Sequence, residues 1–310
     1  MPCNRRQTEC HQVYLNGRGA KEEGEAKEEE DKVKTKDEIQ HILHASLEKG
    51  NMGRFLYPVD TDQFADIRKD GKVYVDKTDM VFDLVSKYRY VFLARPRRFG
   101  KSLLCNTFKA YFLGQKELFE GLKIMDLEKE WKKHPVLHFT MSGLKNCTIP
   151  EAKSALELFI SDYENLYGRN IAEETPGKRF RGLIHRAFEQ TGEKVVVILD
   201  EYDSAIMRLM YEPEQLEAMR TMLREFYQVL KDEGAYLRFV FITGVTKFSQ
   251  LSIFSELNNL KQISMLDEYS GLCGITQEEL DTTLRPCVGE YAQNLNITTE
   301  EAYALLKKNY

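Results

Sequence analysis

Residues 90–104 read Tyr90-Val91-Phe92-Leu93-Ala94-Arg95-Pro96-Arg97-Arg98-Phe99-Gly100-Lys101-Ser102-Leu103-Leu104. A short apolar run, a loop that ends in Gly-Lys-Ser and an apolar helical pattern follow one another in this segment. In such a strand–loop–helix context, backbone N–H groups and a lysine hold the phosphates of a nucleotide. We therefore expect Lys101 to reach the outer phosphates and the Ser102 hydroxyl to bind Mg²⁺.

The loop departs from the usual phosphate-binding pattern at its first position, where Arg95 replaces the expected glycine. Pro96 biases Arg95 toward extended backbone and removes one N–H that could have pointed at phosphate. Arg97 and Arg98 could replace the lost dipoles with full charges, since a guanidinium pairs well with phosphate. The alternative is that they pair with acids on a neighbouring surface. We interpret Phe99 as core packing rather than as a stacking platform for a base.

A Gly-Lys-Ser tripeptide also fits an ordinary strand-to-helix turn, and a second motif favours the phosphate site. Residues 195–203 read Val-Val-Val-Ile-Leu-Asp-Glu-Tyr-Asp, which is typical of a strand buried on both faces of a parallel sheet. Ligands gather at such strand ends in open α/β sheets. We expect Asp200 to hold Mg²⁺, directly or through water, and Glu201 to deprotonate an attacking water. The competing interpretation, a helix cap, is favoured for Asp203 only.

A third apolar run, residues 237–242, ends at Thr243-Gly244. A polar residue at this strand tip would lie between the other two motifs. Thr243 is therefore the candidate catalytic residue to contact the terminal phosphate or the attacking water. A turn hydroxyl that bonds its own backbone is an equally good interpretation of Thr243.

These motifs resemble those of the AAA-ATPase-like family of bacterial proteins, and the resemblance runs from about Phe55 to the C-terminus. The segments that carry it are residues 74–78, 95–102, 199–203, 243–249, 254–260 and 273–280. The Arg-Pro-Arg-Arg-Phe-Gly-Lys-Ser loop is the family's own version of the phosphate loop. The candidate nucleotide-binding residues are accordingly Arg95, Pro96, Arg97, Arg98, Phe99, Gly100, Lys101, Ser102 and Leu103.

The resemblance implies a P-loop ATPase core of the branch with an extra central strand and a catalytic glutamate, with ATP and Mg²⁺ as ligands. It implies a three-layer α/β sandwich with a mostly parallel five-stranded sheet in the order 5-1-4-3-2. Many family members carry a restriction-endonuclease-like nuclease domain at the C-terminus. No candidate nuclease carboxylate cluster follows in this sequence.

Strands that alternate with helices independently predict a mostly parallel α/β sheet. The expected strands are residues 90–94, 135–141, 195–200, 237–243 and 262–266. The expected helices are 62–67, a helix capped by Thr78 or Asp79, 101–112, 152–167, 179–190 and 213–230. Thr276-Gln277-Glu278-Glu279 is a capping box that opens an all-helical end.

The pattern divides the chain into three expected regions. Residues 1–51 are polar and poorly patterned, so we expect a disordered or non-native extension before Met52. Residues 52–270 form the AAA-ATPase-like core. Residues 271–310 form a small helical lid, which we expect to be truncated.

Composition limits the classes of protein. Hydrophobic residues make up 42% of the 310 residues and charged residues 30%, which is ordinary for a globular protein. The formal net charge of −5 does not favour wholesale binding of nucleic acid. No apolar run approaches the about 20 residues of a membrane helix. The six cysteines lack metal-ligand spacing, which indicates reduced thiols in a cytoplasmic protein.

Two hypotheses of function remain. The favoured one is a cytoplasmic Mg²⁺-dependent ATPase whose hydrolysis moves the lid and serves a protein partner or a missing domain. The rival is a nucleotide-gated switch, or a regulator of a nuclease, that binds ATP and hydrolyses it negligibly. The Arg95-Pro96 loop slightly favours the switch, whereas the pair Asp200-Glu201 favours hydrolysis.

Overall fold

The computed structural model describes residues 55–246 and 259–309. The expected extension 1–51 lies outside these residues, as do residues 247–249 and 254–258 of the family-like segments 243–249 and 254–260. The chain divides into two compact units, Leu56–Glu279 and a smaller unit whose described part is Phe55 with residues 280–309. Each unit is described by itself.

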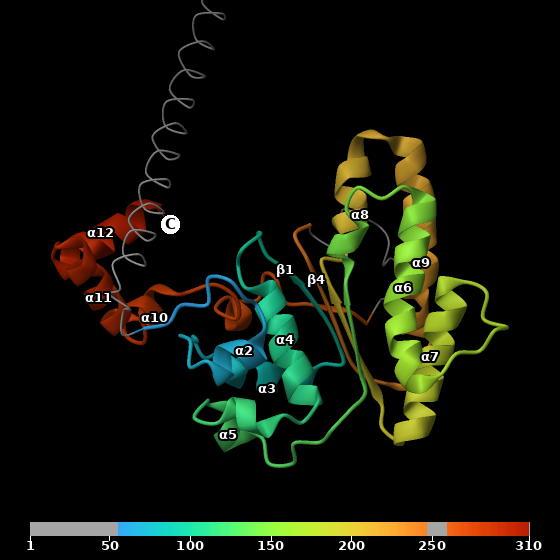
Figure 1. Ribbon diagram of the computed structural model, residues 1–310, viewed down its shortest axis with the longest axis horizontal. Coiled ribbons are helices and arrows are strands. Elements are labelled where there is room, and N and C mark those ends of the chain that lie inside the picture. Colours follow the sequence, from blue (N-terminus) through green and yellow to red (C-terminus); the bar gives the residue numbers. More distant parts are fainter. Residues whose placement is uncertain (1–54, 247–258, 310) are drawn as a thin grey trace, which may run out of the picture. The chain divides into compact units, whose positions relative to one another are not determined.

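A five-stranded sheet forms the centre of the larger unit (Figure 1). Its strands are β1 (Tyr90–Ala94), β2 (Val136–Thr140), β3 (Val195–Asp200), β4 (Leu237–Gly244) and β5 (Lys261–Gln262). Neighbouring strands are parallel and follow the order β2-β3-β4-β1-β5, which reads 5-1-4-3-2 from the other edge. The expectation of a mostly parallel α/β sheet is confirmed.

Strand β5 is shorter than the expected 262–266. Ile263 still donates its N–H to the Phe92 carbonyl at 3.0 Å. One residue later, the hydroxyl of Ser264 accepts the Ala94 N–H at 2.8 Å. A side chain has therefore replaced the backbone carbonyl as partner of β1, and the ladder ends.

Eight helices are described in the larger unit before residue 240. They are α2 (Phe64–Lys69), α3 (Thr78–Lys87), α4 (Lys101–Phe112), α5 (Ile124–Leu127), α6 (Ile149–Tyr167), α7 (Pro176–Thr191), α8 (Ser204–Met207) and α9 (Pro213–Asp232). Short 3₁₀ helices occupy Lys116–Phe119, Met141–Leu144, Arg208–Tyr211 and Asp267–Tyr269. Helices α6 and α7 each begin three residues before the expected start, because Thr148 and Thr175 cap them and a proline follows within two residues.

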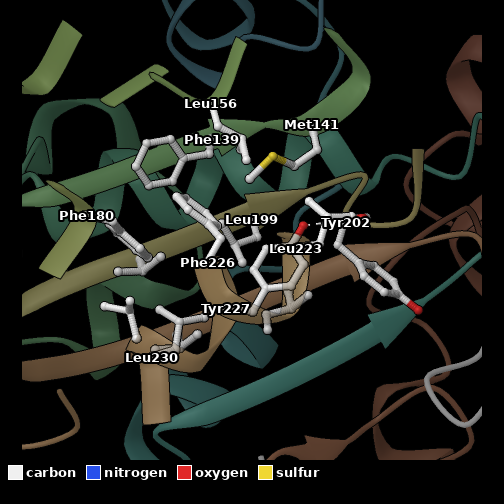
Figure 2. Packing of buried hydrophobic residues seen from close by; sticks show 14 of the residues in the cluster. Phe139, Met141, Leu156, Phe180, Leu199, Tyr202, Leu223, Phe226, Tyr227 and Leu230 are labelled. Carbon is white, nitrogen blue, oxygen red and sulfur yellow. Dashed lines mark hydrogen bonds between the residues drawn. The ribbon is translucent and has the colours of Figure 1, made fainter. Parts of the chain in front are cut away.

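Helices α2 to α5 cover one face of the sheet, and α6, α7 and α9 cover the other (Figure 1). Successive side chains of β3 alternate between the two cores: Val196 and Ile198 pack on the α4 side, and Val197 and Leu199 on the α9 side. This double burial explains the continuous β-branched run. Figure 2 shows the α9-side core, where the rings of Phe180 and Phe226 stack with centroids 4.7 Å apart.

The end of the described chain is helical. Helix α10 (Gln277–Asp281) starts at the predicted capping box, in which Thr276 N–H donates to Glu279 at 2.8 Å. Helices α11 (Arg285–Leu295) and α12 (Thr299–Asn309) pack through an apolar cluster that includes Val288 and Ala302. Their role as a lid remains a prediction.

The described residues bear on two predictions, that the cysteines are reduced and that the chain has no membrane-spanning helix. The cysteines in this part of the chain, Cys105, Cys147, Cys273 and Cys287, are free thiols. Among residues 55–246 and 259–309, no helix has both the length and the apolar character needed to cross a membrane.

A buried ion pair joins α6 to α7 behind the sheet. Arg179 donates from Nε and Nη2 to the two carboxylate oxygens of Glu164, at 3.0 and 2.6 Å, and both residues are at most 6% exposed. Its Nη2 also donates to the Ser161 hydroxyl at 2.8 Å. Longer contacts of 3.9 Å join Arg179 to Glu157 and Glu164 to Arg169, so the bond between Arg179 and Glu164 is the shortest ion pair of this group.

We predict that Glu164→Ala lowers the free energy of unfolding by about 3–5 kcal/mol, because it removes the nearest carboxylate from the buried Arg179 charge and leaves only Glu157, at 3.9 Å, as an ion-pair partner within the described residues. Denaturant unfolding measures the change. The matched control is the double variant Glu164→Leu/Arg179→Leu, which removes both charges and should cost less. A double variant that is less stable than the single one would contradict this account.

Candidate functional site

The carboxyl ends of the strands meet at one edge of the sheet. Ala94 at the end of β1 pairs with Gly244 of β4, and Thr140 of β2 pairs with Asp200 of β3. The loop 95–100 and the turn after Asp200 consequently leave the sheet at the same edge, on either side of β4.

The loop 95–100 closes with a left-handed glycine. Gly100 has φ +82° at the N-terminus of α4, a conformation that glycine adopts without steric cost. Lys101 is the first residue of α4, and its Nζ turns back to donate to the Pro96 carbonyl at 2.9 Å. Leu103 packs against the α4-side core, so only its backbone can face a ligand.

Arg95 anchors the loop to the segment after β5. Its guanidinium donates to the carbonyls of Ser264 at 2.5 Å and Tyr269 at 3.4 Å. Its backbone N–H donates to the Gly244 carbonyl at 3.2 Å. As placed, Arg95 supports the loop rather than extending its charge into solvent.

The side chains of Arg97, Arg98 and Phe99 are exposed. No hydrogen bond or ion pair joins Arg97 or Arg98 to any residue in the described chain. Arg98 has φ +65°, an uncommon value for a residue with a Cβ. Phe99 is 43% exposed, so the interpretation of Phe99 as core packing is wrong. The tip of the loop therefore presents two cations and one ring to solvent.

The two sequence motifs touch through Ser102 and Asp200. The Ser102 hydroxyl donates to Oδ2 of Asp200 at 2.6 Å. Asp200 is 1% exposed, and its Oδ1 is buried without a hydrogen-bond partner. Burial raises the pKa of Asp200, and the hydrogen bond from Ser102 acts in the opposite direction. A cation at this point would satisfy the orphaned oxygen.

The donor set suits a hard cation. A hydroxyl and a carboxylate are oxygen ligands of the kind that Mg²⁺ prefers, and Mg²⁺ usually takes one or two carboxylates together with water and substrate phosphates. Within the described residues, no group of three or more His, Cys, Asp or Glu side chains could hold a metal by itself. Ser102 and Asp200 therefore fit a cation that is completed by phosphate and water.

Glu201 occupies a strained turn directly after Asp200. Its φ of +54° lies in the left-handed region, which costs a residue with a Cβ about 1–3 kcal/mol. Its carboxylate accepts a hydrogen bond from the Ser204 hydroxyl at 3.0 Å. The next residue, Tyr202, is fully buried and donates its N–H to the Thr243 carbonyl at 3.0 Å. The turn is thus held from β4.

The Asp203 side chain also binds the segment after β4. Its Oδ2 accepts the N–H groups of Val245 at 3.0 Å and Thr246 at 2.6 Å. The cap interpretation is therefore wrong for this side chain, because it serves a loop from another strand and not its own helix. Gly244 leaves room for this contact, since a Cβ there would lie 2.6 Å from Oδ1 of Asp203.

Thr243 does not point at the loop. Its side chain is fully buried, and its hydroxyl donates to the Leu93 carbonyl at 2.8 Å. The Thr243 hydroxyl therefore neither faces the expected phosphate position nor bonds to the backbone of its own turn. The reason is the register of β4, in which Thr243 lies directly opposite Leu93 of β1.

Sequence reasoning missed a polar pocket of about 250 Å³ next to Ser102 and Asp200. Its other lining residues are Asp62, Gln63, Asn106, Lys109, His138 and Thr140. Nε2 of His138 is buried without a partner, and burial lowers the pKa of this imidazole to about 4. Only the strand alternation that places His138 and Thr140 on one face of β2 could have suggested this grouping.

Similarity to known proteins gives the family of this chain. The family described as "Predicted AAA-ATPase" matches residues 58–254, and the chain belongs to this family. The matched region contains the loop 95–100, the Asp200-Glu201 turn and strand β4. The family resemblance inferred from the motifs is confirmed.

A relative from Azotobacter chroococcum mcd 1, described as "Uncharacterized protein in vnfD 5'region", is 40% identical over 238 residues. The alignment covers 76% of this chain but only 46% of the relative, so the chain spans under half the length of that protein. No solved structure matches the chain significantly.

We predict that Asp203→Ala lowers the free energy of unfolding by roughly 1–3 kcal/mol, because it leaves buried N–H donors unsatisfied. Asp203→Asn should cost less, since both donors reach the same oxygen and an amide carbonyl can replace it. Denaturant unfolding of the two variants measures the difference. Equal stability of Asp203→Ala and the wild type would show that the hydrogen bonds from Val245 and Thr246 to Asp203 do not stabilise the fold.

Proposed function

We propose that this protein binds ATP with Mg²⁺ across residues 95–102 and hydrolyses it. The observation that carries the proposal is the contact between Ser102 and Asp200, which joins the phosphate loop to the acidic strand end. The orphaned Oδ1 of Asp200 supports it, as do Arg97 and Arg98, which have no hydrogen-bond or ion-pair partner in the described part of the chain. The family description supports ATP as the nucleotide.

Each loop residue has a distinct part in this proposal. The N-terminus of α4 offers backbone N–H groups and a positive dipole to the phosphates. No carboxylate pairs with Lys101 among residues 55–246 and 259–309, and its ammonium would exchange the Pro96 carbonyl for a phosphate oxygen. Arg97 and Arg98 supply the charge that a glycine-led loop would supply through its dipoles.

Glu201 is the proposed general base. Its turn follows the cation ligand Asp200 directly, so its carboxylate lies near the terminal phosphate when Ser102 and Asp200 hold Mg²⁺. A Mg²⁺ ion held by Ser102 and Asp200 would neutralise charge on the phosphates. Glu201 orients an attacking water and removes its proton, while the buried Tyr202 keeps the turn rigid.

The proposed hydrolysis moves a helical lid, and the lid passes this motion on. Residues 280–309, which include helices α11 and α12, belong to a separate unit, which suits a lid that responds to the nucleotide. The proposed receiver of the motion is a further domain or a protein partner.

The rival proposal is a nucleotide-gated switch with negligible turnover. Two contacts favour it: Lys101 is tied to its own loop, and the Glu201 carboxylate is already bonded to Ser204. Measurements of binding and of hydrolysis separate the two proposals.

We predict that Lys101→Ala abolishes measurable ATP binding while the fold survives, because Lys101 is the loop charge closest to the start of α4. Isothermal titration calorimetry with MgATP measures the affinity. Lys116→Ala, an exposed lysine outside the loop, is the matched control and should bind as the wild type does. Unchanged affinity in folded Lys101→Ala would overturn the phosphate-site assignment.

We predict that Glu201→Gln retains bound MgATP but lowers the rate of phosphate release about 10²–10⁴-fold, the range for a lost general base. Asp200→Asn should instead weaken the dependence on Mg²⁺. Glu225→Gln, at an exposed site on α9, serves as the control. Negligible turnover in the wild type itself would favour the switch.

We predict that replacing Arg97 or Arg98 by Ala reduces the preference for ATP over AMP by about 1–3 kcal/mol, the range for hydrogen bonds between charged groups. Each added phosphate increases the attraction of a nearby guanidinium. Binding of both nucleotides to the two single variants and the double variant tests this. An intact preference in all three would show that these arginines serve another surface.

A further inference from the structure

The ring of Phe99 is an exposed aromatic surface on the phosphate loop itself. Phe99 is 43% exposed, and it forms no ring–ring pair with another described aromatic residue. A single exposed hydrophobic side chain is normal on a protein surface, so a role for Phe99 follows from its position and not from its exposure alone.

One edge of the ring is supported by backbone from the segment after β5. A Cβ added at Gly274 would lie 3.3 Å from Cδ1 of Phe99, so the ring lies directly over this glycine. The Gly274 N–H donates to the Phe99 carbonyl at 3.0 Å. Ile275, the next residue, is 61% exposed. The ring is thus held in place while part of it stays open to solvent.

The sheet order gives the direction in which a bound nucleotide extends. Strands β3 and β5 lie on opposite sides of β1. The terminal phosphates belong at the cation ligands Ser102 and Asp200, which is the β3 side. The remainder of the nucleotide then extends toward the β5 side, where Arg95 and Phe99 bind residues 264–274.

We propose that the exposed part of the Phe99 ring, with Ile275 at its edge, is the stacking platform for the purine base of the nucleotide. The inference rests on the proposed function, because it needs phosphates on the loop. Stacking involves the π-face of a base and not its hydrogen-bonding edge. This contact therefore favours binding of purine nucleotides over free polyphosphate, but it does not discriminate adenine from guanine.

The test compares MgATP with magnesium tripolyphosphate, which has the phosphates but no base. Isothermal titration calorimetry on the full chain gives both affinities. We expect Phe99→Ala to weaken MgATP about tenfold or more, the usual loss for a removed stacking ring, and to leave tripolyphosphate unchanged. Ile171→Ala, which removes another exposed apolar side chain, is the matched control and should alter neither affinity.

A second variant keeps the ring and reports on it. Phe99→Trp should retain MgATP affinity, and its added tryptophan fluorescence should change with ATP or GTP but not with tripolyphosphate. Equal losses for both ligands in Phe99→Ala, or no loss for either, would overturn the stacking platform even if Lys101→Ala abolishes binding. A wild-type protein that binds neither ligand would overturn the proposed function and this inference together.

Discussion

Strand β4 lies hydrogen-bonded between β1 and β3, and this parallel pairing brings the loop 95–100 and the Asp200-Glu201 turn to one edge of the sheet. Parallel strands all end on the same side, so two motifs about one hundred residues apart meet without a direct covalent constraint. The hydrogen bond from Ser102 to Asp200 depends on this register. A slip of one residue would turn Asp200 to the other face, away from α4.

The same strand also stabilises the strained turn at the site. The Thr243 carbonyl holds the N–H of Tyr202, and Asp203 holds the N–H groups of Val245 and Thr246. These bonds offset the cost of the left-handed conformation at Glu201. Because these bonds come from β4 and from the two residues that follow it, the position of Glu201 depends on this part of the sheet as well as on its hydrogen bonds with Ser204 of α8. A rigid, half-buried carboxylate of this kind suits a proposed general base.

Much of the architecture follows from local pattern. The β-branched run before Asp200 and the apolar run before Arg95 predict their strands to the residue, because strands buried on both faces need continuous apolar side chains. Helix starts are less accurate, since Thr148 and Thr175 cap α6 and α7 before the apolar periodicity begins. The end of β5 could not be predicted, because it depends on a side-chain contact between Ser264 and Ala94.

The sequence alone predicts the types of residue at the candidate site. They are a Gly-Lys-Ser loop after one strand, the carboxylate pair Asp200-Glu201 at the end of another, and the Thr243 hydroxyl at the end of a third. Spacing and polarity suffice for this, because a phosphate loop and an acidic strand end are local features. Where the side chains point is decided by the packing of distant segments. Tertiary contacts turn Thr243 toward Leu93, Arg95 toward the carbonyls after β5, and Phe99 outward over Gly274. Their partners lie about 150 residues or more away, and no local pattern encodes such a contact.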